Sequence, residues 1–258
     1  CFCSITTHYI LKILKLFLYK NGISPNYYEG EYDGIATELL DRNSGMYHFQ
    51  PEILLIFTYH TDIKNYPQLF SSTEEVAAWV DEKVSFYAQL WANAAAINGC
   101  QIFQTLFVPP IERQLGNLEV NYHFSRTNCL RLLNLELIRR RPANVLFVDA
   151  EYAASYVGKQ SWFDYIGYYI SKQGFSLDAH GVFCHIIARL LAANVGKVKK
   201  CLVLDLDNTL WGGVVGDDGI EGINIDLHNA VGEAFLSFQK YVKLLKDRGV
   251  ILAVCSKN

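Results

Sequence analysis

Short apolar runs alternate with longer stretches of helical periodicity along the chain. The runs cover 53–60, 101–109, 144–150, 201–207 and 250–256, and each is almost continuously apolar. Helical periodicity is clearest between Ser72, which has Glu75 three residues later in a capping-box spacing, and Gly99. Further helices are expected within 124–141, 176–194 and 228–248. Because apolar strands that alternate with helices are typical of parallel sheets covered on both faces, the pattern predicts an α/β fold.

The first helical segment, HYILKILKLFLYKNG (8–22), carries apolar residues at helical spacing, with Lys12, Lys15 and Lys20 between them. Such an amphipathic helix packs on a core or lies on a membrane surface, and we favour the core. A short basic stretch at 196–200 separates a helical pattern from the strand that begins at 201. We therefore predict two domains, 1–195 and 196–258.

Composition narrows the class of protein. The formal net charge of −3 favours neither nucleic acid nor an anionic membrane as a partner, and no apolar run is long enough to span a bilayer. The seven cysteines form no CxxC pair, which argues against a disulfide framework or a zinc site and favours a reducing, cytoplasmic location. Since the chain starts at Cys1 without Met and ends at Asn258 directly after a predicted strand, we expect it to be part of a longer polypeptide.

Two carboxylates follow the apolar run CLVL at 201–204, in the sequence DLDNTLWGG. Alternation along a strand predicts that Asp205 and Asp207 emerge on the same side, which is costly unless a cation, a phosphate group or a shared proton compensates. An ionised carboxylate can attack phosphorus, so Asp205 is the candidate nucleophile. Asp207 is the candidate general acid and base, and both are candidate ligands of Mg²⁺.

A phosphate pocket is expected around these carboxylates. Asn208, Thr209 and Ser256 are the candidate phosphate-binding residues, and the backbone of 210–213 is a candidate for the border of the pocket. The hydroxyl of Thr209 is also a candidate for fixing the turn. Ser256 stands at the end of the strand VILAVCS, where its hydroxyl either donates to a phosphate oxygen or caps a following helix.

These residues resemble a known family. DLDNTLWGGVVGDDG and the later AVCSKN are similar to motifs one and two of the haloacid dehalogenase (HAD) superfamily, most closely to FkbH-like proteins. The resemblance implies that Asp205 is the nucleophile and Mg²⁺ ligand. It also implies that Asp207 is the acid/base whose carbonyl binds the metal, and that Ser256 holds phosphate. It implies as well that 196–258 form the N-terminal part of a HAD Rossmann-like phosphatase domain with motifs one and two only. The motif-three Lys and motif-four acid of the superfamily are expected outside this sequence, since Lys257 comes too early.

The residues before 196 resemble an SGNH-hydrolase-like domain through LLDRNSGMYHFQPEILLI and YYISKQGFSLDAH. That resemblance implies a three-layer, flavodoxin-like parallel sheet. Its catalytic blocks are degenerate: Ser4 follows Phe-Cys in place of Gly-Asp, FTYHTD lacks the Asn, and Asp178 and His180 are one residue too close. Ser176 and Asp178 equally suit a helix cap. The domain is therefore either an esterase remnant built on Ser4, Asp178 and His180, or a binding module.

The sequence as a whole predicts a Mg²⁺-dependent HAD-type enzyme that forms an aspartyl-phosphate. The resemblance implies a phosphorylated small molecule as substrate, with an acyl phosphate such as 1,3-bisphosphoglycerate and transfer of its glyceryl group to an acyl carrier protein as one possibility. A non-catalytic carrier-docking or ligand-binding module is the alternative. A predicted helix ends at Arg139, Arg140 and Arg141. Their positive charges either interact favourably with the dipole of that helix or bind an acidic partner. His60, His123 and His185 lack metal-ligand spacing and are expected to be surface or satisfied core residues.

Overall fold

The computed structural model describes residues 2–3, 5–97 and 99–257. The chain divides into two compact units, Cys1–Val195 (unit 1) and Gly196–Asn258 (unit 2). Each unit is described by itself. The predicted α/β class is confirmed, because both units are built from parallel strands connected by helices.

Unit 1 contains a parallel sheet whose strands follow one another in chain order. The strands are β1 (Phe2–Cys3), β2 (Ile53–Phe57), β3 (Gln101–Thr105) and β4 (Val145–Val148), arranged β1-β2-β3-β4. Cys3 pairs with Phe57, Leu55 with Phe103, and Phe103 with Leu146. All four carboxyl ends therefore meet at one edge, where ligand sites of open α/β sheets usually lie.

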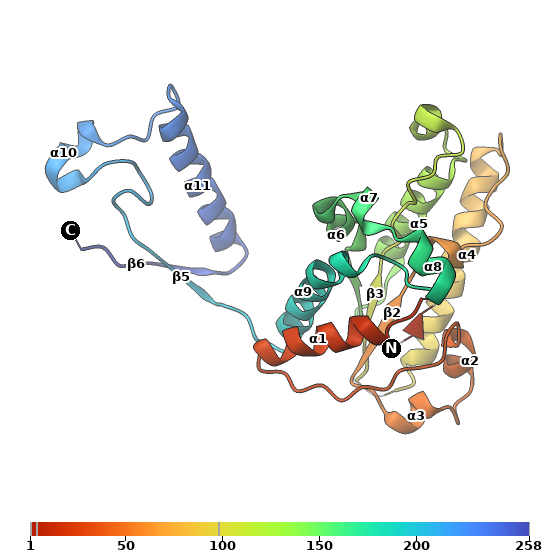
Figure 1. Ribbon diagram of the computed structural model, residues 1–258. Helices are drawn as coiled ribbons and strands as arrows, with labels where there is room; N and C mark the ends of the chain where they lie inside the picture. The colour runs from red at the N-terminus through yellow and green to blue at the C-terminus, as the bar shows by residue number, and fades with distance from the viewer. Residues whose placement is uncertain (1, 4, 98, 258) are drawn as a thin grey trace. The chain divides into compact units, whose positions relative to one another are not determined.

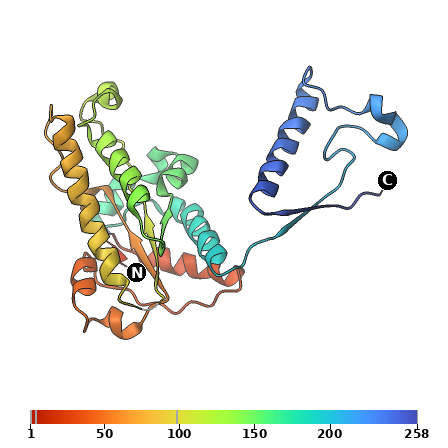
Figure 2. The ribbon, with the colours of Figure 1, turned by 180° about the vertical axis from the view of Figure 1, so that it is seen from behind.

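Helices cover both faces of this sheet (Figures 1 and 2). Side chains alternate between the faces along each strand, so Leu54 and Ile102 enter one core while Leu55 and Phe103 enter the other. The three-layer arrangement is confirmed. The elements that connect the strands are α1 (His8–Lys20), α2 (Ile35–Leu40), α3 (Gly45–Phe49), η1 (His60–Asp62), α4 (Thr73–Ala94), η2 (Gly116–Asn121), α5 (Arg126–Arg140), α6 (Ala150–Val157), α7 (Lys159–Trp162), α8 (Tyr165–Ser171) and α9 (Leu177–Asn194).

Local signals in the sequence fix two of these helices. The Ser72–Glu75 capping box starts α4, where Ser72 Oγ accepts from the Glu75 N–H and the Glu75 carboxylate accepts from the Ser72 N–H. Helix α1 buries Ile10, Leu14 and Leu18 against the core, as the amphipathic pattern predicts. Among the described residues, no helix combines the length and apolar character that a membrane crossing needs.

Unit 2 is a pair of parallel strands with two helices. It consists of β5 (Cys201–Leu204), α10 (Val215–Gly222), α11 (Ala230–Asp247) and β6 (Ile251–Val254). Cys201 pairs with Ile251 and Leu204 with Val254. Val203, Ile251 and Val254 are 58–64% exposed, so this sheet is covered far less than that of unit 1.

Candidate functional site

The pairing of β5 with β6 brings the two sequence motifs of unit 2 together. Leu204 and Val254 are the last paired residues, and the Cys255 N–H donates to the Leu204 carbonyl at 2.9 Å. Asp205 and Ser256 therefore leave the sheet at the same edge, from adjacent strands. Parallel strands present their functional residues at this edge.

Asp205 is the exposed carboxylate of the site. Its Oδ1 accepts a hydrogen bond from the N–H of the next residue, Leu206, at 2.8 Å. This local bond limits the rotation of the side chain, and the residue is exposed. An exposed, oriented carboxylate at a strand end is suited to attack a bound electrophile.

Asp207 is held by its own loop. Its Oδ1 accepts from the Trp211 indole N–H at 3.0 Å and from the Val215 backbone N–H at 3.1 Å. The regular ladder ends at Leu204, so strand alternation does not by itself set the direction of this side chain. The two donors hold one oxygen of Asp207 and so fix the orientation of its carboxylate.

Asn208 shapes the turn that follows. It has φ of 54°, a left-handed conformation that Asn tolerates, and its Oδ1 accepts from the Gly213 N–H at 3.0 Å. Gly213 has φ of 98°, and a Cβ there would lie 2.9 Å from Asp218 Oδ2. The Asn208 side chain thus forms a hydrogen bond across this turn, where the sequence suggested the hydroxyl of Thr209. Thr209 is half-buried.

Ser256 is half-buried beyond the end of β6, and residues 255–257 form no helix. The phosphate contact and the helix cap therefore both stay predictions for this hydroxyl. A hydroxyl beside Asp205 is placed to donate to an anion held at the sheet edge.

The donor set at this edge suits Mg²⁺ in a limited way. The described residues contain no cluster of three or more His, Cys, Asp or Glu side chains that would hold a metal. Mg²⁺ keeps several waters and is commonly bound by one or two carboxylates together with substrate phosphate. Asp205 and the main chain near Asp207 are the oxygen donors that such a site would use.

The proposed esterase residues of unit 1 are not brought together as a catalytic pair. His180 is 1% exposed, and its Nδ1 lies 2.8 Å from the Ser176 carbonyl, whereas Asp178 is exposed. Residues two apart on a helix do not face each other, so α9 separates the two side chains. Burial lowers the pKa of His180. Ser176 caps the helix by accepting from the Ala179 N–H, and Ser4 lies outside the described residues.

An aromatic cluster at the carboxyl edge of β2 was missed by sequence reasoning. The ring of His60 lies 4.3 Å from that of Tyr59 and 5.6 Å from that of Phe163. Tyr59 stacks on Tyr168, whose hydroxyl is 2.7 Å from that of Thr61.

The buried polar atoms of this cluster correct the expectation for His60. Within the described residues, its Nε2 and the Tyr59 hydroxyl are buried without a hydrogen-bond partner. Burial lowers the pKa of His60 to about 4. His60 is thus neither a surface nor a satisfied core histidine, and the polar end of an otherwise apolar strand, TYHT, was the available signal.

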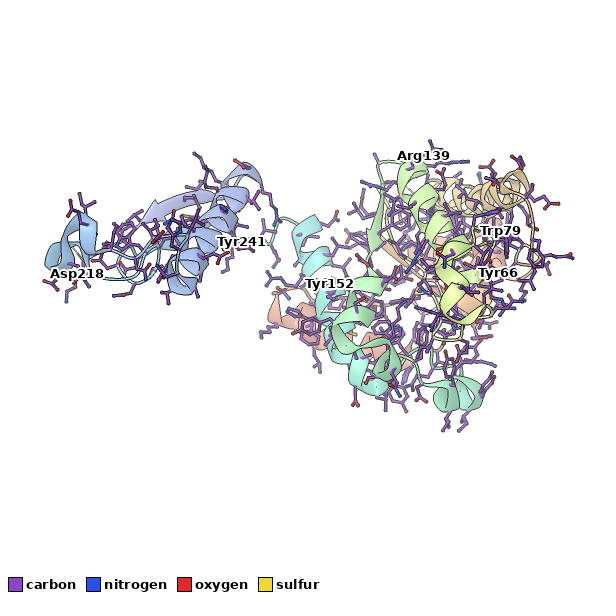
Figure 3. All side chains as sticks on the ribbon, turned by 90° about the horizontal axis from the view of Figure 1, so that it is seen from above. Tyr66, Trp79, Arg139, Tyr152, Asp218 and Tyr241 are labelled. Carbon is purple, nitrogen blue, oxygen red and sulfur yellow. The ribbon has the colours of Figure 1, made fainter. Side chains whose placement is uncertain are left out.

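The arginines that end α5 have partners in unit 1. Figure 3 labels the first of them, Arg139. Arg139 and Arg140 both bond to Glu136, and Arg140 also pairs with Asp81. Arg141 donates to the Val145 carbonyl. The basic run is therefore neutralised locally to a large extent, and exposed pairs of this kind add little stability.

The fold and the strand-end motifs define an α/β protein of the FkbH-like HAD class, with a phosphatase-type unit after a larger N-terminal unit. Residues 4–192 match the family described as "FkbH, N-terminal domain", so the chain belongs to the FkbH family.

A solved structure has the same fold over the whole chain. It is the crystal structure of the N-terminal part of the protein BF1531 from Bacteroides fragilis, containing a phosphatase domain complexed with Mg. The TM-score is 0.82 and the identity 29%, and the match covers 100% of this chain and 68% of that chain. Comparison with the curated proteins found no match.

Proposed function

We propose that the protein acts as a Mg²⁺-dependent HAD-type phosphoryl-transfer enzyme through Asp205. The observation that carries the proposal is the convergence of Asp205 and Ser256 at the carboxyl ends of the paired strands β5 and β6. Membership of the FkbH family and the Mg-bound phosphatase domain of the BF1531 structure support it.

The chemistry of the residues gives a balanced sequence of steps. An oxygen of Asp205 attacks phosphorus in line, the bond from phosphorus to the leaving oxygen breaks, and Asp207 gives its proton to that oxygen when it needs one. Asp207 then takes a proton from water, which attacks the phosphorus, so phosphate leaves and Asp205 is restored. Ser256 donates a hydrogen bond to a phosphate oxygen throughout. When bound, Mg²⁺ supplies charge neutralisation and orients the phosphate.

The substrate class we propose is an acyl phosphate. Attack by Asp205 on its phosphorus releases the acid as a free carboxylate, so transfer of the acyl group to an acyl carrier protein is a separate reaction. In that reaction the carrier thiol attacks the acyl carbon, the bond from that carbon to the phosphate oxygen breaks, and inorganic phosphate leaves with the thiol proton. The resemblance to FkbH-like proteins implies a reaction of this kind, in which a glyceryl group is taken from 1,3-bisphosphoglycerate. A carboxylate is a stable leaving group, so the first step on an acyl phosphate places little demand on Asp207. The half-buried acid of this site fits such a division of labour.

The test is release of inorganic phosphate from acetyl phosphate and from 1,3-bisphosphoglycerate, with Mg²⁺ and with or without a carrier protein. The assay uses the natural polypeptide that carries this chain. In Asp205→Asn the amide oxygen still accepts from Leu206 N–H, so the loop is preserved while the nucleophile is lost. We expect phosphate release to fall at least 100-fold. Asp217→Asn, an exposed acid of α10, is the matched control and should retain the activity of the unaltered protein.

The competing interpretation is a non-catalytic binding or carrier-docking module. It would replace the proposal if neither substrate released phosphate with carrier protein present, or if Asp205→Asn retained substantial turnover. The separation of Asp178 from His180 gives no support to the esterase hypothesis.

A further inference from the structure

Three helices of unit 1 enclose an apolar groove that the proposed phosphoryl transfer does not use. The groove has a volume of about 420 Å³ and is lined by Phe17 of α1, Tyr152 and Tyr156 of α6, and Gly181 and Ile186 of α9, among others. Figure 3 labels Tyr152. This volume lies within the range of about 300–1,000 Å³ that holds small-molecule ligands.

Gly181 creates the depth of the groove. It lies inside α9, an 18-residue helix, where Gly is unfavourable relative to Ala. A Cβ at this position would meet no atom within 4 Å, and its φ is not left-handed. Neither close packing nor backbone conformation therefore requires Gly here. What the missing side chain provides is open space between the helices.

The walls of the groove expose apolar surface to water. Tyr152 is 60% and Tyr156 73% exposed, and both line the groove together with Phe17 and Ile186. The ring of Phe17 packs edge-on against that of His185, with centroids 5.4 Å apart. Covering such surface is favourable for any apolar occupant.

The polarity of the lining selects the occupant. Of the described residues that line the groove, none is Asp, Glu, Lys or Arg, and the residues with polar side chains are Tyr152, Tyr156 and His185. A charged ligand would lose hydration there without gaining a counter-charge. A hydroxyl or carbonyl at the end of an aliphatic chain, in contrast, can bond to tyrosine or histidine.

We infer that this groove binds an uncharged aliphatic chain that carries one neutral polar end group. The lining residues belong to unit 1 and Asp205 belongs to unit 2, so binding to the groove can be tested without phosphate chemistry. The presence or absence of probe binding does not bear on the proposed phosphoryl transfer, and the presence or absence of phosphate release does not bear on ligand binding in the groove.

The experiment measures binding of the uncharged fluorescent probe N-phenyl-1-naphthylamine to the full chain, and its displacement by 1-decanol. Gly181→Leu fills the groove in a position with free space, and Gly181→Ala fills it partly. Both substitutions favour the helix over Gly, so folding should be kept, and far-UV circular dichroism checks this. Gly216→Leu is the matched control, since a Cβ at that α10 position also meets nothing within 4 Å.

We expect saturable probe binding that decanol displaces, a loss of affinity of at least 10-fold in Gly181→Leu, a smaller loss in Gly181→Ala, and a change of less than twofold in Gly216→Leu. Decyl sulfate and decyltrimethylammonium, each below its micelle concentration, should compete at least 10-fold more weakly than decanol. Absence of saturable binding, or equal affinity in a folded Gly181→Leu, would overturn the inference. So would equal competition by the charged chains, or a dimer by light scattering that Gly181→Leu dissociates.

Discussion

Asp207 offers a substitution that separates the two steps of the proposed reaction. In Asp207→Asn the amide oxygen can still accept from Trp211 Nε1 and Val215 N, so both hydrogen bonds of the loop remain. Asp207→Ala removes both. At about 1 kcal/mol for each bond, the Ala variant should lose about 2 kcal/mol of loop stability, and the Asn variant less than about 1 kcal/mol.

The catalytic effect is expected to be larger than the structural one. General acid–base catalysis contributes about 10²–10⁴ in rate, which corresponds to about 3–5.5 kcal/mol of activation free energy. A phosphate monoester needs Asp207 in both steps, because an alkoxide leaves poorly. An acyl phosphate releases a carboxylate, whose acid has a pKa of about 4, and so needs Asp207 mainly to activate water.

The assay is rapid-quench kinetics with Mg²⁺ on two substrates, acetyl phosphate and an alkyl phosphate monoester. Asp207→Asn should give a burst of one acyl product per enzyme from acetyl phosphate and then almost no turnover. The monoester should give neither burst nor turnover. Emission of Trp211, whose indole reports on the loop, should be near normal in the Asn variant and altered in the Ala variant. Steady turnover of both substrates by Asp207→Asn would refute the role assigned to Asp207.

Two further predictions concern unit 1. Asn134 is buried and joins α5 to Phe107, since its Oδ1 accepts from the Phe107 N–H at 2.9 Å and its Nδ2 donates to the Phe107 carbonyl at 2.8 Å. Asn134→Ala leaves two buried groups unpaired and should cost about 2–6 kcal/mol in urea unfolding, whereas Asn128→Ala on the same helix, with more exposed bonds, should cost about 1 kcal/mol or less. A loss below about 1 kcal/mol in Asn134→Ala would contradict the buried-bond argument. Burial lowers the pKa of His60 from 6.5 to about 4. Between these two pH values the imidazole is protonated in the unfolded chain and neutral in the folded chain, so the free energy of unfolding falls as the pH falls through that window. His60→Phe should flatten this fall by at most about 3 kcal/mol, measured as the difference between urea unfolding at pH 7 and at pH 4.5; an unchanged pH dependence would show that His60 titrates normally.

Sequence patterns were sufficient for the framework of the fold. The apolar run ILLIF became a parallel strand covered by helices on both faces, as such a run predicts, whereas the apolar run CLVL became a parallel strand with Cys201 and Val203 exposed. The start of α4 was predictable from Ser72 and Glu75, since a capping box acts within one turn. These signals depend only on residues that are close together in the chain, so they can be read from the sequence.

The details of the sites depended on groups distant in the chain or on irregular backbone. Alternation predicted a shared side for Asp205 and Asp207, but the turn centred on Asn208 directs Asp207 to Trp211. The burial of His60 depends on Phe163 and other residues of later loops, which no periodicity around 60 encodes. Such contacts arise only when the sheet edge is assembled.

The chain order of the four strands in unit 1 bears on how a nascent polypeptide reaches this structure. Cys3 pairs with Phe57, the second strand with the third, and the third with the fourth, so no later strand has to insert between two that are already joined. A ribosome releases the N-terminal end first, and each new strand can therefore add to the open edge as it emerges. Synthesis and assembly of this sheet can proceed in the same direction, with the second strand already paired on one side when the third arrives.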